Sequence, residues 1–327
     1  MITSKSRAGV IGVGAMGQHH ARVYSELADA ELVGVADADR ERAEQIAAEY
    51  GTNAYEINEL IRGVDLVTIA VPTAYHYDIA RDCINAGVDV LIEKPIVEDP
   101  KRGNQLIYQA ERADVTLQVG HIERFNPVTM TLADILPEMN VIAIDAERLG
   151  PRPDRTIEDT AVIDLMIHDI DLACSLIDGE IENVDAIGAE DGRHATATLT
   201  FDSGVVGTLT ASRVTQQKVR KLRVTCEEAL VLVDYIDQSI EIHRQSAPEY
   251  VTEGGKMRYR HESIVEHPAV DSGEPLKFEL ASFVDASREG TPPQVDGSDG
   301  IRALKLAREI NRKAFGSEAK RVGVLAE

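Results

Sequence analysis

Residues 8–17 read Ala8-Gly9-Val10-Ile11-Gly12-Val13-Gly14-Ala15-Met16-Gly17. The first of these residues are apolar or small, which is typical of a short strand buried on both faces. The strand leads directly into a G-x-G-x-x-G turn, and a helical pattern follows the turn. A strand, this turn and a helix, in that order, offer a free helix N-terminus to a diphosphate. The stretch therefore predicts a dinucleotide-binding loop made of Gly12, Val13, Gly14, Ala15, Met16 and Gly17.

Each glycine of the turn has its own expected role. Gly12 permits the tight turn, Gly14 lets the backbone approach the phosphates, and Gly17 lets the helix lie close to the strand. The next predicted strand ends in Asp37, 20 residues beyond Gly17. An acid at this distance is placed to accept a ribose 2′-hydroxyl, and it repels a 2′-phosphate. We therefore expect NAD as the cofactor, while Arg40 nearby leaves NADP open.

The chain has 327 residues, 43% of them hydrophobic, which is enough for two domains with proper cores. It has no run of apolar residues long enough for a membrane span, and its N-terminus lacks a signal-peptide core. We therefore expect a soluble, cytoplasmic protein. The three cysteines are far apart and lack metal-ligand spacing, so they predict small core residues and no metal site.

The charge balance is strongly acidic, because 56 Asp and Glu against 34 Lys and Arg give a formal net charge of −22. This charge argues against nucleic acids and anionic membranes as partners. The excess of Arg over Lys and the many Asp residues favour a high-salt cytoplasm. At molar salt the Debye length falls to about 3 Å, so self-repulsion is screened. An ordinary acidic mesophile is the alternative, and refolding across a salt series distinguishes the two.

The two parts of the chain have different patterns. Residues 1–120 alternate apolar strands with helices, which predicts a doubly wound parallel sheet, an α/β Rossmann domain. Residues 121–327 contain runs of alternating Thr and Val with short turns between them, which predict antiparallel strands and an α+β domain. These runs lie at 194–201, 205–214, 219–225 and 229–235. Further predicted elements are a strand at 140–149, helices at 159–177, 276–289 and 299–314, and a polar, irregular loop or edge excursion at 244–275.

Ligands of doubly wound sheets bind beyond the carboxyl ends of the strands, where this sequence places several polar groups. A lysine directly after an apolar strand and before a proline is an unusual placement, since lysines are mostly exposed. We favour a functional role for this lysine over that of a solvated loop residue. The residues expected to line the cofactor at these ends are Val71, Pro72, Thr73, His76, Glu93 and Lys94.

Asp164 and His168 lie four residues apart on the predicted 159–177 helix, so they share a face. The helix is otherwise apolar nearly all round, and such a helix is buried, so its polar pair faces a cleft or each other. A carboxylate beside an imidazole fixes its tautomer and raises its basicity, which suits proton transfer to an alcohol. A hydrogen-bonded core histidine is the alternative reading of the same pattern.

Taken together, three motifs resemble the glucose–fructose oxidoreductase/inositol dehydrogenase (Gfo/Idh/MocA) family. They are the glycine turn, Glu93-Lys94-Pro95 and Asp164-x-x-x-His168. The resemblance implies a Rossmann domain followed by an open, largely antiparallel sheet that often carries the oligomer interface. It also implies hydride transfer between a nicotinamide and a carbinol carbon, with Lys94 on the reacting hydroxyl, His168 as general acid/base and Asp164 as its partner. A cis Lys94–Pro95 bond is common in the family.

The segments 120–127 and 163–171 look closest to the family's nucleotide-sugar branch, the UDP-N-acetylglucosamine-type 3-dehydrogenases. A sugar nucleotide's diphosphate needs fixed cations, and arginine suits it best. The expected substrate contacts are Lys94, Arg124, Arg148, Arg152, Arg155, Asp164 and His168. For the arginines, pairing with surface acids is an equal alternative.

Two further functions stay open at this stage. An inositol, polyol or free-sugar dehydrogenase needs no diphosphate site. A non-catalytic NAD(H)-binding regulator needs no acid/base groups, and the joint presence of Lys94, Asp164 and His168 argues against it. The strand runs between 194 and 235 suit a sheet interface, so we expect a homodimer or homotetramer.

Overall fold

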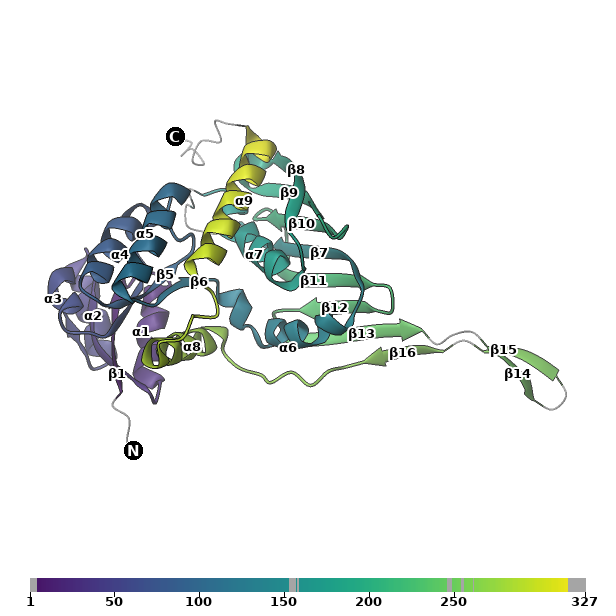
Figure 1. Ribbon diagram of the computed structural model, residues 1–327, viewed down its shortest axis with the longest axis horizontal. Helices are drawn as coiled ribbons and strands as arrows, with labels where there is room; N and C mark the ends of the chain where they lie inside the picture. The colour runs from purple at the N-terminus through teal and green to yellow at the C-terminus, as the bar shows by residue number, and fades with distance from the viewer. Residues whose placement is uncertain are drawn as a thin grey trace. The chain divides into compact units, whose positions relative to one another are not determined.

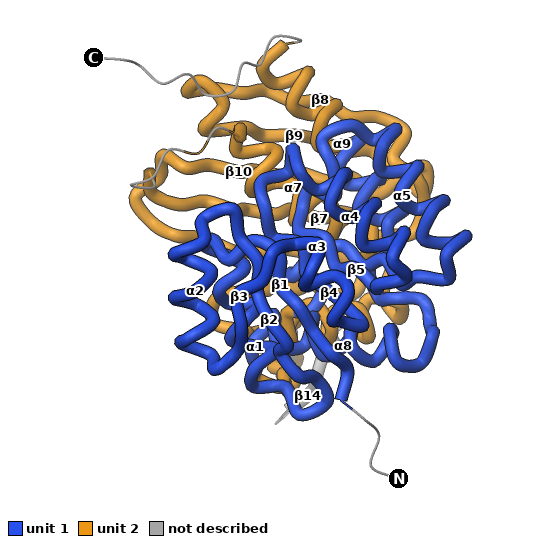
Figure 2. Tube along the Cα trace, turned by 90° about the vertical axis from the view of Figure 1, so that its left-hand side faces the viewer, with its two compact units in different colours: residues 1–125, 273–305 blue, residues 126–272, 306–327 orange. Residues whose placement is uncertain are grey.

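The computed structural model describes residues 5–152, 157, 159–245, 249–253, 256–260 and 262–316. The chain divides into two compact units (Figure 2), of which unit 1 comprises 1–125 and 273–305 and unit 2 comprises 126–272 and 306–327. The first boundary falls at residue 125, close to the 120 predicted from the sequence. The second differs from the prediction, because residues 273–305 return to unit 1 instead of staying with the second domain.

Unit 1 is built on a six-stranded parallel sheet in the order β3-β2-β1-β4-β5-β6. This is the strand order of a Rossmann fold, whose order reverses between β1 and β4. The predicted α/β Rossmann class is confirmed. The strands are β1 (Ser6–Ile11), β2 (Ala30–Ala36), β3 (Asn53–Ala54), β4 (Leu66–Ile69), β5 (Asp89–Glu93) and β6 (Leu117–Gly120).

Helices cover both faces of this sheet, because alternate residues of each buried strand point to opposite sides. One face packs against α3 (Ile57–Ile61), α4 (His76–Asn85) and α5 (Pro100–Ala113) (Figure 1). The other packs against α1 (Gly17–Glu26), α2 (Arg40–Glu49) and α8 (Pro275–Glu289). Residues 273–305 return to unit 1 because α8 buries Leu276, Leu280 and Phe283 against that second face. Burial of these three side chains contributes about 1.5–3 kcal/mol each.

Unit 2 contains an eight-stranded sheet in the order β16-β13-β12-β11-β7-β10-β9-β8. Every pair is antiparallel except β7 with β10, so the predicted, largely antiparallel sheet is confirmed. Its strands are β7 (Val141–Leu149), β8 (Ile181–Ala189), β9 (His194–Phe201), β10 (Val206–Ser212), β11 (Val219–Cys226), β12 (Leu230–Asp234), β13 (Ser239–Gln245) and β16 (Ser263–Glu266).

Residues 244–275, predicted as a polar and irregular loop or edge excursion, contain strands, one of them at the edge of the sheet. Within this segment β14 (Glu249–Glu253) pairs with β15 (Lys256–Arg260), and β16 extends the sheet as an edge strand beside β13. Edge strands and hairpins carry many polar residues, because they have little core to face. In β14 and β16 the apolar residues are adjacent in sequence, so these two strands lack the apolar alternation by which strands are detected, whereas the short β15 keeps it.

Short helices complete the two units. Unit 1 adds η1 (Thr73–Tyr75) and η2 (Ile122–Phe125), and unit 2 adds α6 (Pro127–Ile135), η3 (Leu136–Glu138), η4 (Val162–Met166), α7 (Ile167–Leu176) and η5 (Glu190–Gly192). The final helix α9 (Gly297–Phe315) is divided between the units after residue 305. The predicted 159–177 helix begins instead at Val162, and its first part, η4, is a π-helical turn. No helix in the described ranges is long and apolar enough to cross a bilayer.

A group of buried polar side chains lies on the face of the unit 1 sheet that α1 and α8 cover. Tyr24 of α1 hydrogen-bonds Thr68 of β4 over 3.0 Å, and Gln118 of β6 donates to the Glu279 backbone carbonyl of α8. The Glu279 side chain is fully buried, and neither carboxyl oxygen has a hydrogen-bond partner within the described part of the chain. Burial raises the pKa of Glu279 well above its ordinary value, and the nearby charge of Glu93 adds to the effect. The fold therefore favours the neutral acid at this position.

This burial predicts a pH-dependent stability that Glu279→Gln removes. In the unfolded chain Glu279 ionises above pH ~4.3, whereas in the folded chain it holds its proton to a higher pH. The wild-type protein therefore loses up to about 1.4 kcal/mol of stability per pH unit as the pH rises through this window. Glutamine keeps the shape of the neutral acid, so the stability advantage of the variant grows with pH. Denaturant unfolding at pH 5, 6 and 7 measures it. Exposed Glu111→Gln is the control, and a difference independent of pH contradicts the prediction.

Candidate active site

The glycine turn after β1 has the geometry of a phosphate-binding loop. Gly12 takes a φ of +87°, a left-handed conformation that a side chain rarely adopts. A Cβ at Gly17 would lie 1.7 Å from the Gly12 carbonyl oxygen, so α1 begins hard against the turn. A Cβ at Gly14, in contrast, would meet no atom of the described chain within 4 Å. The three positions thus match the expected roles of a tight turn, an open approach and close helix packing.

Asp37 lies beside this turn, as its spacing predicts. Its Oδ2 accepts a 2.7 Å hydrogen bond from the Val13 backbone N–H, and its Oδ1 accepts one of 2.9 Å from Asp39. Arg40 opens α2 and is exposed, and its Nε donates to Glu44 over 2.8 Å. The loop therefore combines a carboxylate at its side with backbone open to a ligand. These residues fit a dinucleotide, since the open position at Gly14 is where the pyrophosphate approaches the backbone.

His76 connects the ends of two neighbouring strands. It is 1% exposed, with Nε2 lying 2.8 Å from the Val71 carbonyl oxygen and Nδ1 lying 3.0 Å from that of Pro95. Burial lowers the pKa of His76, although both hydrogen bonds oppose the shift. The Lys94–Pro95 bond is cis, as expected. His76 thus bonds the backbone on both sides of the turn and is itself buried, and its contact with the cofactor stays a prediction.

The carboxylate of Glu93 makes hydrogen bonds that hold the turn at Lys94 in place. His20 of α1 lies 2.8 Å from Glu93 Oε1, and the Lys94 backbone N–H donates to Glu93 Oε2 over 3.2 Å. Burial acts to raise the pKa of Glu93, but the hydrogen bond from His20 and the charge of Lys94 outweigh it and lower that pKa. Lys94 itself is half-buried. The structure therefore joins the glycine-loop helix α1 directly to the candidate catalytic lysine.

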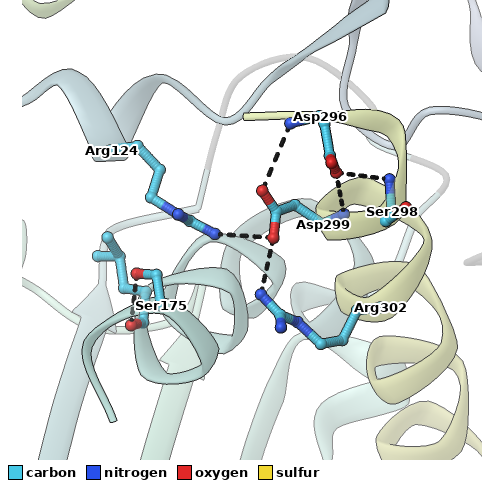
Figure 3. A network of polar contacts seen from close by, with 7 residues as sticks. Arg124, Ser175, Asp296, Ser298, Asp299 and Arg302 are labelled. Atoms are coloured by element: carbon cyan, nitrogen blue, oxygen red, sulfur yellow. Dashed lines mark hydrogen bonds and ion pairs between the residues drawn. The ribbon is translucent and has the colours of Figure 1, made fainter. Parts of the chain in front are cut away.

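Arg124 has an ion-pair partner inside unit 1. It lies on η2, and its Nη2 is 3.5 Å from Asp299 Oδ1 in the first turn of α9 (Figure 3). Arg302 donates to the same oxygen over 2.8 Å. Asp296 accepts the backbone N–H groups of Ser298 and Asp299 and thereby caps the helix. The expected substrate residue Arg124 thus takes part in holding α9.

In unit 2 the candidate acid/base residues lie on the η4–α7 helix. Asp164 is in the π-helical turn, and His168 follows in the first turn of α7. π-turns are rare and are frequent at functional sites. The Asp164 carboxylate lies 2.6 Å from Nη2 of Arg213, a residue directly after β10. The side chain of Arg213 is 6% exposed and that of Asp164 is 25% exposed.

Arg148, expected to contact substrate, is buried in a second ion pair of unit 2. It is 3% exposed, and its Nε and Nη2 donate to Asp169 of α7 over 2.9 and 2.8 Å. The guanidinium also stacks 6.0 Å from the ring centre of Tyr235. This bidentate geometry occupies the fork that a diphosphate would need. The two other expected cations differ, since Arg152 is exposed and Arg155 lies outside the described residues.

Sequence reasoning missed His20 and Arg213. His20 follows Gly17 by three residues and so lies on the same buried side of α1, which is the signal that identifies it. Arg213 follows Leu209 and Ala211 at a spacing of two, which places it on the buried side of β10. A charged side chain at an inward-facing position of a strand needs a partner, so the position of Arg213 in the sequence already indicated a buried ion pair. Among the described residues no group of three or more His, Cys, Asp or Glu is arranged to hold a metal.

Comparison with known proteins agrees with this geometry. Residues 6–121 match the model of an oxidoreductase family with an NAD-binding Rossmann fold, and residues 141–231 match the GFO/IDH/MocA C-terminal domain. The fold and the glycine loop define an NAD-binding oxidoreductase. The chain belongs to the GFO/IDH/MocA family, whose members among its relatives are sugar and polyol dehydrogenases.

Relatives that match over nearly their full length include dehydrogenases of a nucleotide sugar and of inositol. The UDP-N-acetylglucosamine 3-dehydrogenase of Acidithiobacillus ferrooxidans is 33% identical over 93% of this chain and 96% of its own. A solved structure of that enzyme superposes with a TM-score of 0.86 at 31% identity, covering 98% of this chain and 100% of that one. The inositol 2-dehydrogenase of Rhizobium meliloti is 28% identical over 92% of this chain and 94% of its own.

The loop geometry makes Gly14→Ala a clean test of cofactor approach. A methyl group here meets no atom of the described chain, so folding stability should be unchanged. It would collide only with a bound pyrophosphate, at a cost of roughly 1–3 kcal/mol, which is an NADH Kd about 5- to 150-fold higher. Fluorescence titration with NADH measures the affinity. Gly150→Ala, equally unobstructed but in unit 2, is the control. Unchanged affinity in Gly14→Ala would contradict the assignment of the loop.

Proposed function

We propose that this dehydrogenase oxidises a ring hydroxyl of a nucleotide sugar of the UDP-N-acetylglucosamine type. The observation that carries the proposal is the 33% identity to a UDP-N-acetylglucosamine 3-dehydrogenase across nearly the full length of both chains. NAD⁺, when bound, supplies the hydride acceptor. Asp37 takes the ribose hydroxyl and disfavours a 2′-phosphate, and Glu44 and Glu56 beside Arg40 strengthen that preference for NAD over NADP.

Three side chains of this protein carry out the acid/base chemistry. Lys94 donates a hydrogen bond to the oxygen of the reacting hydroxyl and stabilises its developing negative charge. His168 accepts the hydroxyl proton as the carbon–hydrogen bond gives up its electron pair as hydride. Asp164 orients the imidazole and balances the charge that it gains. In the reverse direction the same groups return the proton to the carbonyl oxygen.

Of the arginines suggested by the sequence for a diphosphate, we propose Arg152 and Arg155. Arg148 is committed to Asp169 and Arg124 to Asp299, so their charge is balanced inside the fold. Arg152 is exposed just after β7. An exposed guanidinium keeps its five donors for a ligand, and its planar fork fits a phosphate better than lysine does.

An inositol or polyol dehydrogenase is the second candidate. The inositol 2-dehydrogenase relative covers 92% of this chain, only slightly less than the nucleotide-sugar enzyme does. Such an enzyme uses the same acid/base groups but no diphosphate contact. We disfavour a non-catalytic NAD(H)-binding protein, since Lys94 directly follows β5 and Asp164 and His168 lie on η4 and α7.

We also propose a homodimer or homotetramer, formed through the outward face of the eight-stranded sheet, in a high-salt cytoplasm. On that face Lys221 stands opposite both Glu147 and Asp234, and Arg223 stands opposite Asp145. Rows of alternating charge suit an isologous contact, in which the same patch meets itself. The net charge of −22 fits a surface screened by salt. Sedimentation measured across a salt series tests both parts.

Lys94→Ala and His168→Ala should each lower kcat by about 10²- to 10⁴-fold, because each removes a group that acts on the reacting proton. NADH binding should survive, since the glycine loop and Asp37 are intact. Stopped-flow turnover and NADH titration separate the two effects. Lys101→Ala and His243→Ala, on exposed or half-exposed surface, are the matched controls. Wild-type turnover in both site variants would refute the assigned roles.

The substrate class is tested by the appearance of NADH absorbance with UDP-N-acetylglucosamine, N-acetylglucosamine or myo-inositol. We expect kcat/KM for the nucleotide sugar to exceed the others by roughly 10- to 100-fold, since a charged hydrogen bond to phosphate contributes about 1.5–3 kcal/mol. Arg152→Gln should remove most of this preference and leave the rate with myo-inositol unchanged. Faster oxidation of myo-inositol, indifferent to Arg152, would favour the polyol alternative.

A further inference from the structure

Arg213 is a buried cation that the proposed chemistry does not yet use. It is 5% exposed and directly follows β10, where its backbone N–H donates to the Arg193 carbonyl over 2.8 Å. A charge taken out of water is costly unless it is paired and hydrogen-bonded. Removal of such a partner therefore affects the group to which it is paired, and here that group is Asp164.

The guanidinium binds three points on the turn that leads into the acid/base helix. Nη1 donates to the Asp159 carbonyl over 2.6 Å, and Nη2 donates to the Thr160 carbonyl over 3.4 Å and to Asp164 Oδ2 over 2.6 Å. The Asp164 backbone N–H itself bonds the Thr160 carbonyl over 3.0 Å. Arg213 therefore fixes both the backbone that carries Asp164 and the direction of its carboxylate.

Two of the five N–H groups of the guanidinium make none of these three bonds, and one of the two is on Nε. Arg213 Nε is buried and has no hydrogen-bond partner within the described part of the chain. Arg148, the other buried arginine of this unit, uses its Nε on Asp169. An unsatisfied buried N–H is destabilising, so the three bonds that Arg213 makes must outweigh this cost. Arg213 is oriented so that two of its three bonds serve the carbonyls and one serves the carboxylate.

We propose that Arg213 is a positioning residue for the acid/base pair. It holds the carboxylate of Asp164, and thereby fixes the position of the negative charge that lies four residues before His168 on the η4–α7 helix. This inference rests on the proposed function, in which His168 exchanges the proton of the hydroxyl. The charged groups on the elements around this turn in unit 2 include Asp164 with Arg213, the Arg148–Asp169 pair, Asp159 and Asp171. They also include Arg308, Glu309 and Arg312 of α9, since Thr160 donates to Asn311 of that helix over 2.6 Å.

The decisive measurement is the NMR titration of the His168 imidazole, which needs no turnover. The signal is assigned among the nine histidines by its loss in His168→Gln. In Arg213→Gln a positive charge is lost and the full charge of Asp164 is left near the ring, so the His168 titration should move to higher pH. Arg213→Lys keeps the charge and should restore most of the wild-type curve. Arg193→Gln, which removes a half-exposed arginine of the same unit, is the control.

Kinetics supply the second arm. Arg213→Gln should lower kcat by roughly 10- to 100-fold, as removal of a supporting partner does in other sites, and raise KM little. The acid limb of the kcat profile should move upward in pH together with the NMR titration. In an Asp164→Asn background the same substitution should lower kcat by a smaller factor than in the wild type, because the ion pair with the carboxylate is already lost and only the bonds to the Asp159 and Thr160 carbonyls remain.

Three outcomes overturn the proposal. They are an unchanged His168 titration in Arg213→Gln, additive losses in the double variant, and a loss of thermal stability without any change of kcat or pH profile. If Arg213→Gln does not fold, Arg213→Lys and Asp164→Asn carry the same comparison. A wild-type protein that oxidises none of the sugars would refute the proposed function instead, and the His168 titration would still report on Arg213.

Discussion

The hydrogen bond between Glu93 and His20 is the contact on which unit 1 depends at its functional edge. A carboxylate at the end of a buried strand is costly unless donors surround it. Here the donors are the His20 ring and the Lys94 backbone N–H. The same contact fixes the position of α1, whose first residue Gly17 closes the glycine loop. The loop for the diphosphate and the turn that presents Lys94 are therefore set by one buried charge.

In unit 2 two carboxylates are paired with arginines. Its helix brings Asp164 and Asp169 to the inner side of the sheet, and each carboxylate receives a guanidinium from a neighbouring strand end. Arg148 ends the inward row of β7, after Ile144 and Ala146, and Arg213 ends that of β10, after Leu209 and Ala211. The parallel pairing of β7 with β10 places these two strand ends side by side. The candidate acid/base helix thus rests on two ion pairs from adjacent strands.

Parts of the fold and of the candidate site could be predicted where their sequence pattern lies within a few neighbouring residues. The glycine turn, Asp37 and the β5 end were found because strand, turn and spacing lie within a few residues of one another. The place of α8 in unit 1 was not predicted, because the strands on which it packs are distant in sequence. The pairing of β14 with β15 and of β16 with β13 was not predicted, because these short polar segments carry little periodic signal. Arg148 illustrates a different failure, in which the residue was singled out for its charge while its inward strand phase was overlooked. Glu279 was not singled out from the sequence, although Leu276, Leu280 and Phe283 place it on the buried side of its helix.

The pairing of the buried arginines with carboxylates limits how this acidic protein can bind an anionic substrate. With a net charge of −22 the surface repels a diphosphate at low salt, so long-range attraction cannot bring the substrate in. Recognition then depends on a few short-range hydrogen bonds from fixed donors, which screening by salt affects least. The charges of Arg148 and Arg213 are neutralised by Asp169 and Asp164. These two arginines therefore help to hold the fold but add no net positive potential that would attract a substrate. A diphosphate contact in this protein must therefore come from arginines outside these pairs, and among the proposed cations the exposed Arg152 meets that condition.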